Sequence, residues 1–100
     1  MNDVSEAMLE QCDEAARVLK ALAHPQRLQI LCHLAEAERT VGELERLCEA
    51  SQSLVSQFLA RMKAEGLVAS RREGQYVKYE VADPKVHKLL RAMQKIFCPS

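Results

Sequence analysis

The chain of 100 residues has no tryptophan, only two Tyr and two Phe, and no hydrophobic run long enough to cross a membrane. So few aromatic side chains argue against the base-stacking platforms of many RNA-binding domains. A membrane span needs about 18 consecutive apolar residues, and the acidic start of the chain does not resemble a signal peptide. Three glycines and three prolines in a chain that is 48% hydrophobic do not indicate disorder. We therefore expect a single cytoplasmic domain spanning residues 1–100.

The cysteines lack every spacing that marks zinc fingers, thioredoxin-like motifs or haem attachment. Cys12, Cys32, Cys48 and Cys98 lie far apart, without a Cys-x-x-Cys or a His-x-x-x-His motif. Structural disulfides are rare in the cytoplasm, so we expect these thiols to be reduced at rest. Because the chain also lacks a Ser/His/Asp set and a phosphate-binding loop, we expect neither an enzyme nor a cofactor.

The net charge of zero, from 14 basic and 14 acidic residues, hides an uneven distribution. Residues 1–16 carry five acidic residues and no basic one, whereas residues 51–79 carry five basic residues and two acidic ones. A local basic patch fits either nucleic-acid binding or an ordinary solvated surface. Charge alone leaves both interpretations open.

The spacing of apolar residues is helical over most of the chain. It predicts helices over residues 1–22, 25–35, 41–48, 52–64 and 85–98. Thr40 followed by Glu43 predicts a capping box, Ser51 predicts an N-cap, and Gly66 predicts the end of the fourth helix. Alternation of Val77, Tyr79 and Val81 with polar residues predicts a half-buried strand in a hairpin over residues 67–81, with its turn at Glu73-Gly74.

The third and fourth helices are separated by about three residues, which is typical of a helix-turn-helix over residues 40–64. The second helix of this motif lies in the DNA major groove, and a following hairpin is typical of a winged helix. We therefore predict a mainly α fold with a small β-hairpin wing, in the order α-α-α-α-β-β-α. The apolar stripes of the helices at 1–22 and 85–98 fit either the domain's own core or a homodimer interface.

Four stretches resemble the ArsR/SmtB-type family of bacterial repressors. They read LAHPQRLQIL at 22–31, VGEL at 41–44, SQSLVSQFL at 51–59 and EGLV at 65–68. The similarity covers nearly the whole chain and departs at Phe58, where relatives usually carry His. The resemblance implies a winged-helix homodimer that binds a palindromic operator on double-stranded DNA and responds to an inducer. It also implies that the helices at 1–22 and 85–98 form the dimer interface.

Polar side chains on the fourth helix and the hairpin are the candidates for DNA contact. They are Ser51, Gln52, Ser53, Ser56, Gln57 and Arg61 on the helix, and Arg71, Arg72, Gln75 and Lys78 on the wing. Gln and Ser hydrogen-bond base edges, whereas Arg and Lys bind phosphates. The alternative is that Ser51 is only a helix cap and that the others are solvated.

Neither metal site of the family is complete in this sequence. One site carries a Cys-x-Cys where this chain has only Cys48. The other needs an Asp-x-His, and here Asp83 is followed by Pro84 and Lys85. Zinc requires three or four ligands, so we expect no metal site and interpret His87 as a surface histidine.

Cys32 and Cys98 match, position by position, the two cysteines of a redox- and reactive-sulfur-sensing branch of the family. The resemblance implies that they form a disulfide or polysulfide bridge when reactive sulfur or an oxidant appears. The residues alone leave open two inert buried thiols. We interpret Cys12 and Cys48 as packing residues. The alternative function is a metal- or metalloid-responsive repressor that recruits Cys48 or Cys98 across the dimer.

Overall fold

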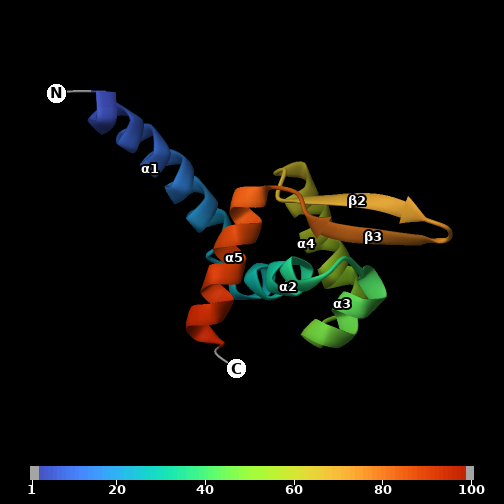
Figure 1. The fold of residues 1–100 in the computed structure, drawn as a ribbon. Coiled ribbons are helices and arrows are strands. Elements are labelled where there is room, and N and C mark those ends of the chain that lie inside the picture. Colours follow the sequence, from blue (N-terminus) through green and yellow to red (C-terminus); the bar gives the residue numbers. More distant parts are fainter. Residues whose placement is uncertain (1–2, 99–100) are drawn as a thin grey trace.

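The computed structural model describes residues 3–98 and has the predicted architecture, a mainly helical domain with a small antiparallel sheet (Figure 1). Its elements are α1 (Asp3–Leu22), α2 (Pro25–Glu36), β1 (Arg39–Thr40), α3 (Val41–Cys48), α4 (Gln52–Ala64), β2 (Val68–Glu73), β3 (Tyr76–Val81) and α5 (Pro84–Phe97). The prediction of a winged helix-turn-helix is therefore confirmed. Residues 1–2 of the predicted first helix lie outside the described residues. Between residues 3 and 98, no helix is long and apolar enough to cross a membrane.

One hydrophobic core joins the middle of the chain to α5. Its largest fully buried side chains are Leu31, Leu44, Val55, Leu59, Met62, Val86 and Leu90. They come from α2, α3, α4 and α5, and α2 packs against both α5 and α3. Burial of these apolar side chains supplies the main driving force for folding of the domain.

The helices begin and end at the residues that predicted their boundaries. Pro25 opens α2, where its fixed φ fits the first turn and its missing N–H costs nothing. The capping box before α3 is formed in both directions: the amide N of Thr40 donates to Glu43 Oε1 at 2.8 Å, and the amide N of Glu43 donates to Thr40 Oγ1 at 3.2 Å. Gly66 follows α4 with a φ of 80°, a conformation that favours glycine.

The sheet has the strand order β1-β3-β2, and β1 was not predicted. Arg39 and Thr40 pair with Tyr79 and Lys78 on β3. A strand of two residues is too short to show periodicity, so no pattern in the sequence predicts it. The prediction of a half-buried β3 holds for Tyr79, which packs against the core, but not for Val77, which is exposed because the hairpin extends beyond the core.

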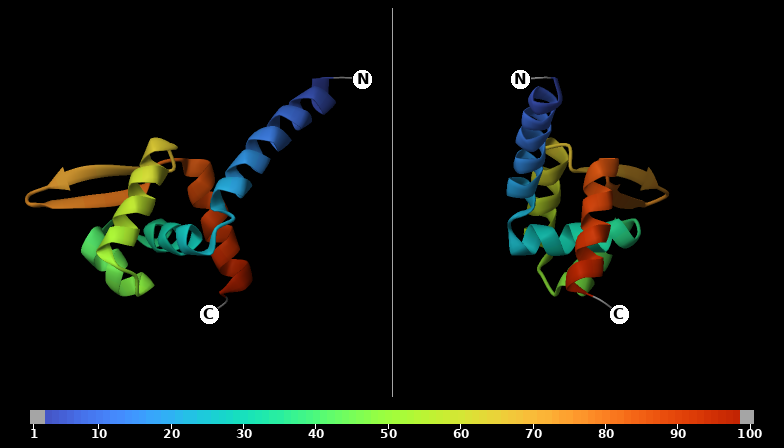
Figure 2. Two further views of the ribbon diagram at one scale, coloured as in Figure 1. Left: turned by 180° about the vertical axis from the view of Figure 1, so that it is seen from behind. Right: turned by 60° about the vertical axis from the view of Figure 1, so that its left-hand side comes forward.

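The first helix projects away from the rest of the domain (Figures 1 and 2). Its last turns pack on the core through Val18, Ala21 and Leu22. Most of its predicted apolar stripe therefore has no covering surface among residues 3–98. The exposed fractions of Met8, Leu9 and Leu19 are 60%, 68% and 51%.

Candidate functional site

The recognition helix α4 presents a polar face because its apolar face is held in the core. Val55, Leu59 and Met62 are buried, and α4 is turned so that the opposite side reaches solvent. The exposed polar residues of its first two turns are Gln52, Ser53, Ser56 and Gln57, with Arg61 one turn further on. These side chains carry both donors and acceptors, which is the inventory needed to contact base edges.

Ser51 acts first as a helix cap, since its Oγ accepts a hydrogen bond of 3.2 Å from the amide N of Leu54. Glu49 takes a left-handed conformation with a φ of 50°, and this sharp turn joins α3 to α4 through three residues. The hydroxyl of Ser51 is therefore positioned at the start of α4, next to the exposed polar face.

The side chain of Phe58 points from α4 toward the start of α2 and does not belong to the exposed polar face of α4. Its ring and that of His24 are 5.2 Å apart between centroids and tilted by 60°. His24, Gln57 and Arg61 also line a small hollow beside Phe58. No pattern in the sequence indicates that His24 is a neighbour of the recognition helix, because only the folded chain brings position 24 next to position 58.

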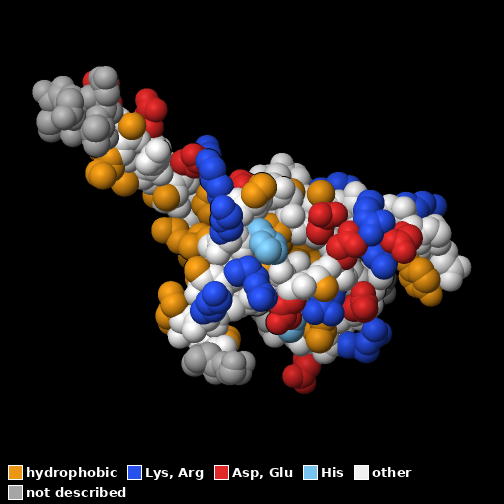
Figure 3. All heavy atoms as spheres, viewed as in Figure 1, with side chains coloured by type: hydrophobic (Ala, Val, Ile, Leu, Met, Phe, Trp, Pro, Cys, Tyr) orange, Lys and Arg blue, Asp and Glu red, His pale blue; other side chains and the backbone are white. Residues whose placement is uncertain are grey.

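Arg71 on the wing is held by two carboxylates of the protein. Its Nε and Nη2 donate to the two carboxylate oxygens of Glu38 at 2.8 and 2.6 Å, and its Nη1 donates to Glu73 at 2.8 Å. The hydrogen bond from Arg71 lowers the pKa of Glu38, and both carboxylates raise the pKa of Arg71. Acidic and basic side chains mix over the wing on this face (Figure 3). Arg71 therefore anchors the wing to the segment before β1.

Arg72 faces the other side of the wing, because successive residues of a strand point to opposite faces. It shares that side with Ser70, whose Oγ accepts a 2.7 Å hydrogen bond from Lys63 of α4. Within residues 3–98, Arg72 forms no ion pair and is exposed. Gln75 lies exposed in the hairpin turn, whereas Lys78 is half-buried and lies 3.6 Å from Glu73. The predicted wing residues thus divide into Arg72 and Gln75, which are free, and Arg71 and Lys78, which are paired.

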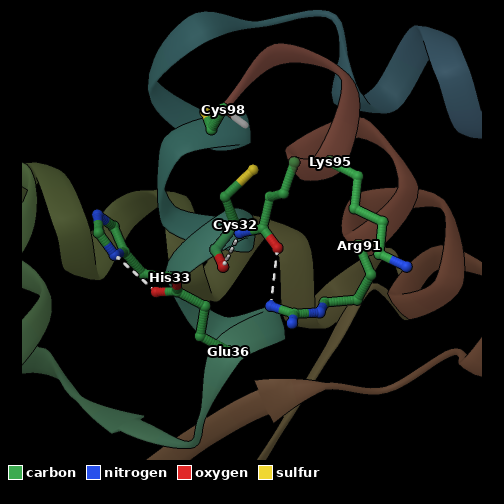
Figure 4. Close-up of a pocket in the computed structure, with 7 residues that line it drawn as sticks. Cys32, His33, Glu36, Arg91, Lys95 and Cys98 are labelled. Atoms are coloured by element: carbon green, nitrogen blue, oxygen red, sulfur yellow. Dashed lines mark hydrogen bonds and ion pairs between the residues drawn. The ribbon is translucent and has the colours of Figure 1, made fainter. Parts of the chain in front are cut away.

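The structure brings Cys32 and Cys98 to one cavity. Cys32 lies on α2 and is half-buried, whereas Cys98 is exposed at the C-cap of α5. The cavity has a volume of about 710 Å³, and its walls are completed by His33, Glu36, Arg91, Gln94 and Lys95. Both thiols are free, and the Cys32 sulfur points toward the end of α5 where Cys98 lies (Figure 4).

Burial raises the pKa of the Cys32 thiol, and the neighbouring Cys98 and Glu36 add to the effect. A raised pKa leaves less thiolate at neutral pH, and the thiolate is the nucleophile in sulfur exchange. Cys98, which is exposed, is the more accessible of the two sulfurs. The two thiols of this cavity therefore differ in both exposure and acidity.

Two hydrogen bonds tie α5 to α2 around this cavity. The Gln94 amide Nε2 donates to the carbonyl O of Cys32 at 3.0 Å, and Arg91 Nη1 donates to Gln94 Oε1 at 2.9 Å. His87 Nε2 lies 3.0 Å from the carbonyl O of Ala35. His87 is thus a surface histidine with a structural contact. The role of Gln94 could not be predicted from the sequence, because its partner on α2 is a backbone group.

The other two cysteines differ from each other. Cys48 is half-buried against the core, as a packing residue should be, and burial raises its pKa. Cys12 is exposed on α1. The interpretation of Cys12 as a packing residue is therefore wrong within one chain. Only the last turns of α1, which follow position 12, pack on the core.

Within the described part of the chain, no three His, Cys, Asp or Glu side chains lie close enough together to hold a metal ion. Cys48 lies on α3 without a second ligand beside it, and Asp83 uses its carboxylate to cap α5 by accepting from the amide N of Lys85 at 2.8 Å. No observation on these residues favours a metal centre.

A winged helix-turn-helix with an exposed polar recognition helix defines a DNA-binding transcriptional regulator. The sequence matches the model of bacterial regulatory proteins of the arsR family over residues 24–70. It is 41% identical over 92 residues to a biofilm growth-associated repressor of Agrobacterium fabrum, covering 92% of this chain and 79% of the relative. The chain therefore belongs to the ArsR family.

Solved structures support the same assignment. The crystal structure of the transcriptional regulator HlyU from Vibrio vulnificus superposes with a TM-score of 0.88 at 38% identity, covering 93% of this chain and 97% of that one. A homodimeric winged helix-turn-helix DNA-binding domain from Mycobacterium bovis gives a TM-score of 0.72 at 38% identity, covering 96% and 86%. The resemblance to the redox-sensing branch, to which the biofilm repressors and HlyU belong, is confirmed. These relatives are DNA-binding regulators and not enzymes.

Proposed function

We propose that this chain is a homodimeric, cytoplasmic repressor whose binding to a palindromic operator is switched by a Cys32–Cys98 bridge. The observation that carries the proposal is the shared cavity, which two reduced thiols from separate helices line together. Cys32 and Cys98 are 66 positions apart in the sequence, so local chain geometry does not bring them together, and two inert thiols would have no reason to meet. The match of both positions to the redox-sensing branch supports the same interpretation.

The switch is a two-electron oxidation of the thiol pair. An oxidant or an electrophilic sulfur species reacts with the exposed Cys98 sulfur, and the Cys32 thiolate then displaces the leaving group to close the bridge. The protein loses two hydrogen atoms if the product is a disulfide. A direct disulfide requires Cα atoms roughly 4.4–6.8 Å apart, whereas a polysulfide spans a longer distance.

Bridge closure reaches the DNA-binding surface through α2. The carbonyl O of Cys32 already accepts from Gln94 of α5, so pulling Cys98 toward Cys32 changes how α5 lies against α2. α2 in turn packs against α3, the first helix of the DNA-binding motif. Recognition helices of a dimer must match half-sites about 34 Å apart, so a small rotation of each protomer weakens operator binding.

In the reduced dimer, we assign base contacts to Gln52, Ser53, Ser56 and Gln57, with Ser51 at the start of the helix. Phosphate contacts are assigned to Arg61, Arg72 and Gln75, while Arg71 and Lys78 support the wing. The exposed polar face of α4 and the free side of the wing support this assignment. The interface is assigned to α1 and α5, whose exposed apolar side chains lack a cover within one chain.

The test combines intact mass spectrometry with operator binding measured by fluorescence anisotropy. Reduced protein should bind the operator tightly, and treatment with a persulfide should change its mass by sulfur units or by two hydrogens and release the DNA. Cys32→Ser and Cys98→Ser should bind DNA but retain it after treatment, because one thiol cannot close the bridge. Cys12→Ser is the matched control, since Cys12 is also free and exposed. Normal release by Cys32→Ser would contradict the switch.

A further inference from the structure

The recognition helix α4 has a different neighbour on each of its two flanks. An α-helix turns by about 100° per residue, so the two edges of its exposed face carry different side chains. On one flank, Lys63 donates a 2.7 Å hydrogen bond to Ser70 of the hairpin. On the other flank, Phe58 packs against His24, which precedes α2. Seen from behind, the hairpin and the start of α2 lie on opposite sides of α4 (Figure 2).

A helix in the major groove meets a sugar–phosphate backbone on each side. The groove is about 12 Å wide, and a helix with its side chains is about 10–12 Å across, so both flanks approach phosphates. On the hairpin flank, Arg72 is the exposed cation that we assign to phosphate. The flank beside α2 therefore faces the opposite backbone with groups of its own.

A small hollow lies on this second flank of α4. It has a volume of about 200 Å³, and it is lined by His24 together with Leu54, Gln57, Phe58 and Arg61 of α4. None of these residues is acidic, and α4 itself contains no carboxylate. Arginine and glutamine side chains are among the groups that contact DNA phosphates. The hollow therefore suits a phosphate group by its charge and by its donors.

The two strongest donors of the hollow are free to bind. Arg61 and His24 are exposed, and within residues 3–98 neither forms an ion pair or a side-chain hydrogen bond. Glu65, the first acidic residue after α4, pairs with Arg27 and so does not neutralise Arg61. A guanidinium and an imidazole N–H both donate hydrogen bonds to anionic oxygens. The hollow therefore offers two unpaired donors to an incoming phosphate.

Phe58 holds the His24 ring in place within the protein itself. The centroids of the two rings are 5.2 Å apart, and the ring planes are tilted by 60°. Favourable aromatic pairs have centroids about 4.5–7 Å apart, so this contact restrains the imidazole. A side chain that is already restrained loses less conformational entropy on binding. The packing therefore lowers the entropic cost of a contact between His24 and DNA.

We propose that His24 and Arg61 hold one operator phosphate between them in each half-site, so that His24 is a DNA contact outside both the recognition helix and the wing. This inference rests on the proposed placement of α4 in the major groove and does not depend on the thiol switch. The contact adds affinity and fixes the position of α4 in the groove. It reads no base, because a phosphate carries no sequence information.

The experiment combines protein variants with DNA that is neutral at single backbone positions. The probe is a duplex that the reduced protein selects from a random pool, with one phosphate at a time in each half-site replaced by an uncharged methylphosphonate. Anisotropy gives the dissociation constant. His24→Phe keeps a ring against Phe58 but removes both ring nitrogens. It should weaken binding roughly fivefold per protomer, or about 25-fold for a dimer, as expected for one hydrogen bond to a charged group.

The effects of the variant and of the neutral phosphate should not add. At one symmetric pair of positions, the methylphosphonate should weaken binding of the natural sequence and cancel the further effects of His24→Phe and Arg61→Ala. Arg72→Ala is the matched control, because Arg72 lies on the hairpin flank and should keep its full effect on the same modified duplex. The proposal is overturned if no position cancels the effect of His24→Phe, or if this variant binds the unmodified duplex like the natural sequence.

Ala60→Glu separates this inference from the docking on which it rests. Ala60 is exposed on α4, so a glutamate there places a negative charge against the DNA without entering the core. If Ala60→Glu binds the selected duplex like the natural sequence, α4 does not face DNA, and the proposed docking is wrong together with the phosphate contact. If Ala60→Glu abolishes binding while His24→Phe has no effect, the docking stands and only the contact of His24 is wrong.

Discussion

Two adjacent arginines on β2 have opposite surroundings. Arg71 is clamped by Glu38 and Glu73, whereas Arg72 is free on the side of the wing that contacts α4 through Ser70. Alternation along the strand creates this difference, and the carboxylates decide which arginine is available to a phosphate. Both residues are arginine, but we expect them to have different roles because their surroundings differ.

Replacing Arg72 by Ala should weaken operator binding by on the order of 1 kcal/mol per protomer, because a charge-assisted contact to phosphate is lost. Replacing Arg71 by Ala should have the smaller direct effect on DNA, but it should loosen the wing and increase hydrogen exchange in β2 and β3. Anisotropy titrations at fixed salt check the first effect, and exchange mass spectrometry checks the second. Equal losses of affinity in the two variants would argue against this division of roles.

If the proposed bridge forms, Cys32 should set the pH dependence of its closure. Its pKa is raised by burial, by Cys98 and by Glu36, so its thiolate is scarce at pH 7 and increases with pH. The closing step should therefore accelerate by about tenfold per pH unit from pH 7 upward, until the pH approaches that raised pKa. Stopped-flow measurement of closure, after Cys98 has been modified, gives this rate directly.

The carboxylate of Glu36 offers a control for that interpretation. Glu36→Gln removes one of the charges that raise the pKa of Cys32, so closure at pH 7 should become faster, by roughly twofold for an exposed and screened charge. A slower closure in this variant would mean that Glu36 acts by positioning and not by its charge.

The short helix α3 depends on its capping box. It has only eight residues, and Thr40 and Glu43 satisfy each other's backbone amides at its start. Thr40→Ala should lower the free energy of unfolding by about 1 kcal/mol, whereas Thr40→Ser should keep most of it, because the serine hydroxyl also caps. Urea denaturation at one protein concentration gives both values. Equal stability of the two variants would rule out a contribution from the cap.

The features that could be predicted from the sequence are the element boundaries at which single residues have a strong local conformational preference. Proline at a helix start, the capping box, and Gly66 after α4 each carry a conformational preference that acts within a few positions. The meeting of Cys32 with Cys98 followed from family resemblance, since no local pattern relates residues on two helices. β1, the His24–Phe58 contact and the Gln94 hydrogen bond could not be predicted, because each depends on packing between distant segments.

At the scale of the whole molecule, α1 and α5 are complementary in charge. α1 carries five acidic and two basic residues, whereas α5 carries no acidic residue. Lys85 of α5 already pairs with Glu14 of α1 at 3.2 Å. Apolar side chains at both helices remain uncovered in one chain, with Ile96 and Phe97 exposed by 69% and 76%. A second copy of the chain fits both the apolar and the charged character of these surfaces.

Leu19→Glu should therefore convert the protein to a monomer at micromolar concentration, because it places a charge within the uncovered apolar stripe of α1. Tyr76→Glu, at an exposed apolar residue of the wing, should leave the oligomeric state unchanged. Light scattering coupled to size-exclusion chromatography measures both masses. A dimeric Leu19→Glu protein would place the interface elsewhere.

The clamp on Arg71 also has a thermodynamic consequence for the complex with DNA. Each phosphate neutralised by a basic side chain releases condensed counterions, and the logarithm of the binding constant falls with the logarithm of salt concentration by about 0.9 per contact. If Arg61, Arg71, Arg72 and Lys78 all bound phosphate, a dimer would show a slope of about −7. Because Glu38 and Glu73 already neutralise Arg71 and Lys78, the slope should be nearer to about −4. A doubling of the salt concentration would then weaken operator binding by about 16-fold instead of about 130-fold, so that the paired arginine and lysine make operator occupancy less sensitive to osmotic changes in cellular ion content.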